Sequence, residues 1–179
     1  MTEAVLDGDT FDFIVSGAGS AGCAVAGRLA ESGKHKVLLL EAGPKDNAFW
    51  IKPPMGYPML FADPRVNWMF ESEPEAELGH RRMYQPRGKV LGGTSSINGM
   101  LYIRGQREDY DLWRQMGCTG WSYDDVLPFF RKAEDQQRGE DMFHGVGGPL
   151  KVSNQPGGSK IADAIVAAMQ ILPRDNPWN

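Results

Sequence analysis

The sequence predicts an α/β fold organised around one strand–helix–strand unit near the N-terminus, at residues 11–43. An apolar run at 13–15 is typical of a short strand, and a second apolar run lies at 36–40. Between them, three glycines with G-x-G-x-x-G spacing precede a helical pattern that Gly33 can end. The order strand, glycine turn, helix, strand is that of a parallel βαβ unit.

The three glycines have separate steric roles in such a unit. Gly17 permits the tight turn out of the strand, Gly19 leaves room for a pyrophosphate to approach the backbone, and Gly22 lets the helix pack close to the sheet. The N-terminus of the helix offers free N–H groups and a partial positive charge to the anion. The pattern favours a dinucleotide site over a purely structural glycine-rich turn.

Glu41 ends the second strand, and a carboxylate there can accept hydrogen bonds from both hydroxyls of a ribose. The same charge would repel a 2′-phosphate, which argues against NADP. The unit by itself does not choose between NAD and FAD.

Composition predicts a soluble globular chain, because 23% of the 179 residues are charged and 41% are hydrophobic. The length is enough for one domain with a sizeable core. A net charge of −4 gives no indication of binding to nucleic acid or to an anionic membrane. No apolar run is long enough to span a membrane, and the polar first ten residues are unlike a secretory signal.

Two cysteines favour a reducing, cytoplasmic location without a disulfide. Cys23 falls in the expected first helix, where we predict a small buried hydrophobic side chain. The cysteines and the three histidines lack metal-ligand spacing, so no metal site is predicted. Each histidine is interpreted as a surface or loop residue.

Residues 44–67 contain five prolines, which forbid a long regular element there. The stretch is too apolar for a solvated linker, so we expect an ordered excursion that packs on the rest of the protein. A short strand is predicted at 68–70, and another extended piece at 82–85.

The stretch 88–111 holds a second glycine turn, Gly92-Gly93, followed by Thr94, Ser95 and Ser96. Thr94 or Ser95 can cap a helix beginning near Ser96, whose N–H groups would face an anion or an electron-rich ring. An ordinary glycine turn with a hydroxyl cap explains the same residues, and the pattern alone leaves both interpretations open.

The remaining chain predicts two further helices and a strand. Ser122 is a good N-cap for a helix whose apolar stripe, placed in the core, comprises Val126, Leu127, Phe129 and Phe130. A charged loop at 135–148 and a strand at 150–152 follow. A last helix is expected from Ser159, with apolar residues at helical spacing from 161 to 172, ended by Pro173 and followed by a tail at 175–179.

The stretch GKVLGGTSSINGMLYIRGQREDYD, from Gly88 to Asp111, resembles the first signature of the glucose–methanol–choline (GMC) flavoprotein oxidoreductases. The segments DPRVNWMFESEPE at 63–75 and GWSYDDVLPFFRKAE at 120–134 resemble the same family, as do His144-Gly145 and Gly148-Pro149-Leu150. The similarity covers about residues 11–172 and is strongest with choline-dehydrogenase-like and aryl- or alkyl-alcohol members. It implies that residues 1–179 are the N-terminal part of a Rossmann-like FAD-binding domain, with 11–43 as the ADP-binding unit and 88–111 on the flavin side.

The resemblance implies FAD as the cofactor. The implied pyrophosphate contacts are Gly17, Gly19, Ser20 and Gly22, and Glu41 with Ala42 lies at the adenosine ribose. Trp68, Gly88, Val90, Gly93 and Thr94 are implied along the flavin half, and Asn98, Gly99, Met100 and Leu101 beside the isoalloxazine and ribityl chain. Some members carry a histidine joined covalently to the flavin where this chain has Ile97, so non-covalent FAD is expected.

The implied function is oxidation of a CH–OH group, from alcohol to aldehyde or ketone, with hydride passing to flavin N5. Alternatives are a non-redox flavoprotein of the same fold, such as a hydroxynitrile lyase or photodecarboxylase, and a fragment that is inactive alone. Family members are much longer, and their active-site histidine lies late in the chain. We therefore expect no catalytic residue and no substrate domain in residues 1–179, and a C-terminal remainder as partner. The sequence does not indicate which alcohol or which electron acceptor is used.

Overall fold

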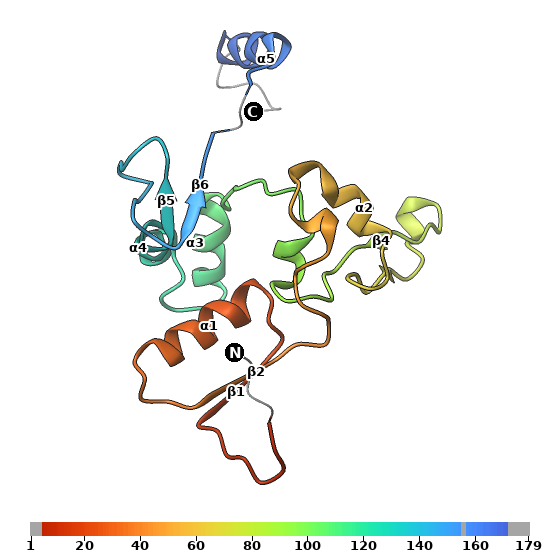
Figure 1. Cartoon of the computed structure of the whole chain (residues 1–179). Coiled ribbons are helices and arrows are strands. Elements are labelled where there is room, and N and C mark those ends of the chain that lie inside the picture. The colour runs from red at the N-terminus through yellow and green to blue at the C-terminus, as the bar shows by residue number, and fades with distance from the viewer. Residues whose placement is uncertain (1–4, 155–156, 172–179) are drawn as a thin grey trace. The chain divides into compact units, whose positions relative to one another are not determined.

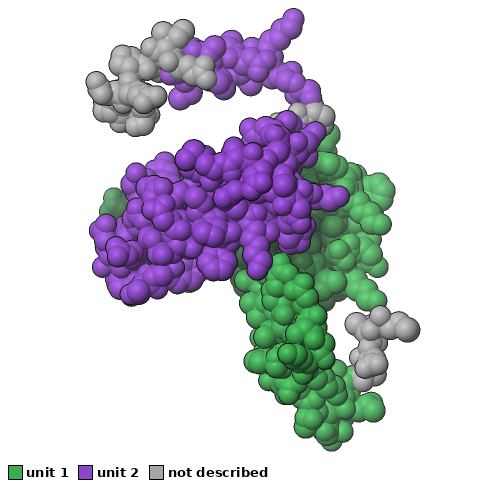
Figure 2. All heavy atoms as spheres, turned by 90° about the vertical axis from the view of Figure 1, so that its left-hand side faces the viewer, with its two compact units in different colours: residues 1–101 green, residues 102–179 purple. Residues whose placement is uncertain are grey.

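The computed structural model describes residues 5–154 and 157–171 (Figure 1), which fall into two compact units. Residues 1–101 belong to unit 1 and residues 102–179 to unit 2 (Figure 2). The predicted glycine turns both lie in unit 1.

Unit 1 begins with the predicted βαβ unit, formed by β1 (Phe13–Ser16), α1 (Ser20–Glu31) and β2 (Val37–Leu40) (Figure 1). β1 and β2 are parallel, with Phe13 opposite Val37 and Ser16 opposite Leu40. Gly33 has a φ of +65°, the left-handed conformation that commonly follows a helix end. The predicted order and type of these elements are confirmed.

Cys23 departs from prediction, because it is exposed on α1 rather than buried. Its Sγ lies 3.2 Å from the carbonyl oxygen of Ala18 in the glycine turn. The helix face that carries Cys23 is not covered by the part of the chain that the structure describes.

The proline-rich excursion has no long regular element, as predicted; its short helices are η1 (Phe49–Ile51), η2 (Pro54–Gly56) and α2 (Tyr57–Phe61). It packs against the rest of unit 1 through a small hydrophobic core. That core comprises Leu60, Val66, Val90 and Ile97, with Ala48, Ile51 and Phe61 packed against it. The excursion is therefore an ordered part of unit 1.

A short antiparallel pair, β3 (Phe70–Glu71) and β4 (Tyr84–Gln85), follows, with η3 (Ala76–Leu78) between the strands. The strand expected at 68–70 begins only at Phe70, because Met69 adopts a left-handed φ of +57° that interrupts extended backbone. The extended piece expected at 82–85 is confirmed in its last two residues.

Of the two interpretations left open for this stretch, the helix beginning near Ser96 does not form, and the glycine turn with its hydroxyl bonds does. It contains η4 (Gly93–Ser96), a single 3₁₀ turn that ends at Ile97. Thr94 does not cap a helix; its Oγ1 accepts a hydrogen bond from the Gly88 N–H at 3.1 Å. The Oγ of Ser95 and of Ser96 donate back to the carbonyls of Gly92 and Leu91, so these hydroxyls stabilise the turn itself.

The two glycine turns contact each other backbone to backbone. The N–H of Gly92 donates to the carbonyl of Ala18 at 2.7 Å. A Cβ built on Gly93 would lie 2.7 Å from the Cα of Gly19, and one built on Gly88 would lie 2.2 Å from the carbonyl carbon of Gly93. Side chains at these positions have no space, so the glycines allow the segment at 88–96 to pack directly on the βαβ turn.

Unit 2 contains α3 (Arg107–Gln115), α4 (Tyr123–Ala133), the parallel pair β5 (Glu134–Gln136) and β6 (Leu150–Val152), and α5 (Lys160–Ile171). The Ser122 cap of α4 is confirmed: its side chain accepts from the N–H of Asp125, whose side chain in turn accepts from the Ser122 N–H. The strand at 150–152 and the start of the last helix are also confirmed. Residues 172, 173 and 175–179 lie outside the described residues.

Two predictions for unit 2 fail. Residues 134–136 form β5, although 135–148 was expected to be a loop throughout. Phe129 is 71% exposed, so it does not belong to the core, and Val126, Leu127 and Phe130 are only partly buried. Successive helical positions differ by about 100°, which places the rings of Phe129 and Phe130 on different faces of α4. Phe130 packs edge-on against Tyr110 of α3.

The centre of unit 2 holds a fully buried carboxylate, Glu134. Its Oε2 lies 2.5 Å from Nη2 of Arg104, and its Oε1 accepts from Nε2 of Gln136 at 3.1 Å and lies 3.0 Å from Nδ1 of His144. Burial alone would raise the pKa of Glu134, but the hydrogen bonds from His144 and the Gly145 N–H and the charge of Arg104 lower it below its ordinary value. His144 is a loop residue, as predicted, and its ring helps to hold this carboxylate.

We predict that Glu134→Gln lowers the free energy of unfolding at pH 7 by about 3–5 kcal/mol, because it leaves the largely buried Arg104 without its counter-ion. Urea denaturation measures the change. Glu140→Gln is the matched control, since it removes an exposed partner of Arg131 and should cost less than about 1 kcal/mol.

The ion pair of Glu134 and Arg104 also makes the stability of the protein depend on pH, in a direction that the lowered pKa of Glu134 determines. A carboxylate whose pKa is lower in the folded state than in the unfolded state stabilises the fold at pH values above its unfolded-state pKa. This stabilisation is lost as the pH falls through the folded-state pKa. The difference between the wild-type protein and Glu134→Gln should therefore shrink on acidification. A difference that grows, or one matched by Glu140→Gln, contradicts this account.

We predict that Gly93→Ala destabilises the protein by about 2–4 kcal/mol, from left-handed strain together with the clash against Gly19. Gly79→Ala is the control, because Gly79 has a similar φ of +65° but open space around its Cβ position, so strain alone should cost about 1–2 kcal/mol. Equal losses for the two variants would rule out the close contact with Gly19.

Candidate functional site: a cleft at the glycine turn

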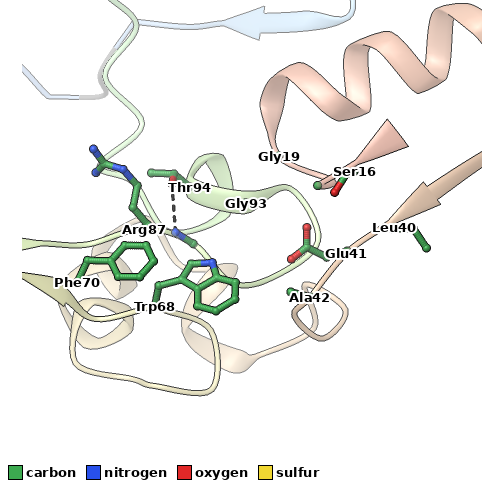
Figure 3. Close-up of a pocket in the computed structure, with 12 residues that line it drawn as sticks. Ser16, Gly19, Leu40, Glu41, Ala42, Trp68, Phe70, Arg87, Gly93 and Thr94 are labelled. Carbon is green, nitrogen blue, oxygen red and sulfur yellow. Dashed lines mark hydrogen bonds between the residues drawn. The ribbon is translucent and has the colours of Figure 1, made fainter. Parts of the chain in front are cut away.

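A cleft of about 640 Å³ opens where β1 and β2 end and α1 begins (Figure 3). Ligands of parallel α/β sheets bind at this carboxyl end of the strands. The residues that line it are Ser16, Gly17, Gly19, Leu40, Glu41, Ala42, Trp68, Phe70, Arg87, Gly88, Gly93 and Thr94. Eight of the fifteen sequence-predicted site residues are among them: Gly17, Gly19, Glu41, Ala42, Trp68, Gly88, Gly93 and Thr94.

The glycine turn leaves space and hydrogen-bond donors on the cleft side. Gly17 has a φ of +91°, and a Cβ there would meet nothing within 4 Å. A Cβ on Gly19 would meet only the Cα of Gly93, at 4.0 Å. Gly19 is the N-cap of α1 and no side chain caps the helix, so the N–H groups of its first turn are available to an anion.

Gly22 has a different role from the other two glycines. A Cβ there would lie 1.9 Å from the carbonyl oxygen of Gly17 and 3.5 Å from Cγ1 of Val15. The missing side chain lets α1 approach β1 and the turn, as the sequence predicted. Gly22 thus shapes the cleft from behind without lining it.

Glu41 braces the turn from the second strand. Its Oε2 accepts the N–H of Ala18 at 2.8 Å, and its Oε1 accepts the N–H of Gly43 at 2.9 Å. Sequence reasoning missed the bond to Ala18, which joins residues 23 positions apart. Each carboxylate oxygen can accept more than one hydrogen bond, so capacity for ribose hydroxyls remains.

The other wall of the cleft comes from 68–70 and 87–88. The rings of Trp68 and Phe70 are stacked, with centroids 5.8 Å apart and planes 5° apart. Nζ of Lys89 lies 4.7 Å from the centroid of Trp68, within reach of a cation–π interaction. The arrangement gives a half-exposed aromatic surface with cations beside it.

Asn67 holds this wall in place, and its only signal in the sequence is a polar residue in an apolar run. It is 2% exposed, and its Nδ2 donates to the Phe61 carbonyl at 3.0 Å and to the Tyr84 hydroxyl at 2.8 Å. Its Oδ1 accepts the N–H of Met69 at 3.1 Å and of Arg87 at 3.0 Å. The residues on either side of Trp68 are thereby fixed, and so is the backbone of Arg87.

The remaining predicted residues lie off the cleft. Val90 is fully buried in the core, and Ser20 and Gly22 belong to α1 without lining the cleft. Asn98 and Met100 line a smaller pocket of about 200 Å³ together with residues of the excursion, Trp50 and Tyr57 among them. Gly99 and Leu101 line neither pocket, and Leu101 is 89% exposed.

Two other classes of site have no support in the described part of the chain. Residues 5–154 and 157–171 contain no group of three or more His, Cys, Asp or Glu side chains placed to hold a metal ion. Within the same ranges, no helix has the length and apolar character needed to cross a membrane.

Comparison with known proteins agrees with the resemblance seen in the sequence. The model of the GMC oxidoreductase family matches residues 11–171. The chain is 50% identical over 147 residues to an oxygen-dependent choline dehydrogenase of Photobacterium profundum, and the match covers 81% of this chain and 26% of that protein. It is 52% identical over 142 residues to the oxygen-dependent choline dehydrogenase of Vibrio vulnificus, and that match covers 78% of this chain and 25% of that protein.

A solved structure gives the same result for the fold. Pyridoxine 4-oxidase from Mesorbium loti matches with a TM-score of 0.82 and 34% identity, over 89% of this chain and 31% of that one. The chain thus spans about a quarter to a third of the length of these relatives. The chain belongs to the GMC oxidoreductase family, and its α/β fold is the N-terminal FAD-binding portion of that family.

Proposed function

We propose that this chain forms the FAD-binding part of an oxidoreductase that converts an alcohol to an aldehyde or ketone. The observation that carries the proposal is the cleft, with an uncapped helix N-terminus on one side, Glu41 beside it and an aromatic wall opposite. GMC enzymes use FAD. The names of the relatives, choline dehydrogenase and pyridoxine 4-oxidase, refer to alcohols, and we extend that substrate class to this chain.

The positions of the cleft residues favour one orientation of FAD along the cleft. The first turn of α1 would receive the pyrophosphate, and Glu41 the hydroxyls of the adenosine ribose. The flavin half would lie toward Trp68, Gly88, Gly93 and Thr94, and on to Asn98, Gly99, Met100 and Leu101. When bound, FAD would supply the hydride acceptor, while this chain binds and orients it.

We propose that the group that takes the hydroxyl proton lies in the part of the family's length that this chain does not cover. The surface of the βαβ unit supports such a partner. Ile14 of β1 is 64% exposed, Val25 of α1 51% and Leu40 of β2 48%, although parallel strands are ordinarily covered on both faces. We propose that the remaining part of the enzyme covers this surface and carries the substrate domain, and that the enzyme acts in the cytoplasm.

The test is to purify the complete enzyme, in which this chain is joined to the proposed remaining part, and to titrate it with alcohols in the absence of oxygen. Flavin absorbance that bleaches on addition of a primary alcohol supports the proposal. A protein that binds no FAD contradicts the cofactor assignment. FAD that is never bleached by any alcohol, although dithionite reduces it, contradicts the assigned reaction.

We predict that FAD is bound without a covalent link, because the position of the linking histidine is taken by Ile97. This aliphatic side chain is fully buried in the core of unit 1 and offers no nucleophilic atom. Acid denaturation followed by filtration should release all flavin into the filtrate. Flavin that stays with the polypeptide would refute the prediction.

We predict that Gly19→Val abolishes FAD incorporation while the protein still folds. The backbone of Gly19 is extended and the Cβ position is open, so the fold tolerates the side chain, but its methyl groups would fill the space assigned to the pyrophosphate. Gly27→Val places the same side chain at an open position on the same helix and serves as the control. Flavin content per polypeptide is the measurement, and full FAD content in folded Gly19→Val would show that the pyrophosphate lies elsewhere.

A further inference from the structure

We infer that Arg87 places a positive charge beside the flavin half of the bound FAD and stabilises the flavin in its reduced form. The inference rests on the proposed function, because it requires FAD in the cleft. It concerns a residue outside the set that the sequence predicted, and it assigns that residue to the electrochemistry of the flavin rather than to FAD anchoring.

The charges of the cleft are separated. Among the residues that line it, Glu41 is the only anion and Arg87 the only cation. Figure 3 shows them at opposite ends, with Glu41 beside Ala42 and Leu40, and Arg87 beside Phe70. If Glu41 and the N-terminus of α1 hold the ADP half, the flavin half extends to the end that contains Arg87.

The backbone of Arg87 is held by two hydrogen bonds. Its N–H donates to Oδ1 of the buried Asn67 at 3.0 Å, and its carbonyl accepts the N–H of Trp68 at 2.9 Å. These two bonds tie Arg87 to the aromatic wall, so its side chain starts from a defined point at the cleft edge.

The guanidinium is not neutralised by a carboxylate. Its Nη1 donates to the carbonyl of Pro86 at 2.7 Å, and it forms no ion pair with any residue that the structure describes. Three other arginines of unit 1 are each paired with a carboxylate: Arg28, Arg65 and Arg82. Arg87 thus keeps four N–H donors and a full charge for a ligand in the cleft.

A cation at this position has a chemical consequence. Two-electron reduction of a flavin adds negative charge to the ring system, and a fixed positive charge nearby stabilises the reduced form relative to the oxidised form. Arg87 would therefore raise the reduction potential of the bound FAD and favour hydride transfer from the alcohol. The competing role is to bind the pyrophosphate, because arginine is also well suited to phosphate.

The experiment compares the wild-type protein with Arg87→Gln, Arg87→Lys and Arg28→Gln. Arg28 lies in the last turn of α1, away from the turn that meets the cleft, and its substitution removes the same charge. Two quantities are measured: the reduction potential of the flavin at saturating FAD, and the affinity for ADP in competition with FAD. ADP contains the pyrophosphate and ribose but no flavin, so it separates the two roles.

We expect Arg87→Gln to shift the equilibrium toward oxidised flavin about tenfold, which is about 30 mV for a two-electron couple. ADP affinity should not change, Arg87→Lys should retain most of the potential, and Arg28→Gln should match the wild-type protein. If Arg87→Gln fails to retain FAD but binds ADP normally, the contact with the flavin half is still supported.

Other outcomes overturn the inference. ADP affinity that falls in Arg87→Gln would assign the side chain to the phosphates. A potential that is unchanged in Arg87→Gln, or shifted equally in Arg28→Gln, would show that Arg87 has no specific effect on the flavin. Failure of the wild-type protein to bind FAD would instead contradict the proposed function itself.

Discussion

The cleft depends on one contact, the direct packing of two glycine-rich turns against each other. Gly93 approaches Gly19 so closely that a side chain on Gly93 would have no room, and the Gly92 N–H bonds to Ala18. This contact fixes the turn whose N–H groups face the cleft, and it also brings Thr94 and Gly88 to the opposite wall. A two-stranded sheet is marginal by itself, so the βαβ turn gains its rigidity from a segment about 70 residues later in the chain.

Within unit 1, the polar groups near this contact are of two kinds. Buried groups with all bonds made, such as Asn67, hold the walls of the cleft. Groups at the surface of the cleft keep bonding capacity: the uncapped first turn of α1, the second lone pairs of Glu41 and the donors of Arg87. The orientation that we propose for FAD rests on this separation of anion and cation.

The sequence predicted the elements that local rules determine. The βαβ unit follows from strand runs and glycine spacing, and the α4 start from Ser122 with Asp125, because these residues act within a few positions of each other. Contacts between residues further apart were missed. For Thr94 the sequence left a helix cap and a turn open, and the structure shows that it bonds back to Gly88; the bond from the Ala18 N–H to Glu41 had no local signal. Glu134 at a helix end resembles a solvated charge, and nothing nearby indicates that Arg104, 30 positions earlier, meets it.

The two units show how a structural polar cluster differs from a candidate ligand site. In unit 2, Glu134 is surrounded by Arg104, His144, Gln136 and the Gly145 N–H, so its charge is balanced within the fold and it has no exposed surface. In unit 1, Glu41 and Arg87 stand at the edge of a cleft, and Arg87 has no carboxylate partner among the described residues. A carboxylate whose charge is balanced inside the fold has no bonding capacity left for a ligand, whereas the exposed Arg87 keeps both its charge and its donors at the cleft, and this difference is why we assign a ligand role to Arg87 and a structural role to Glu134.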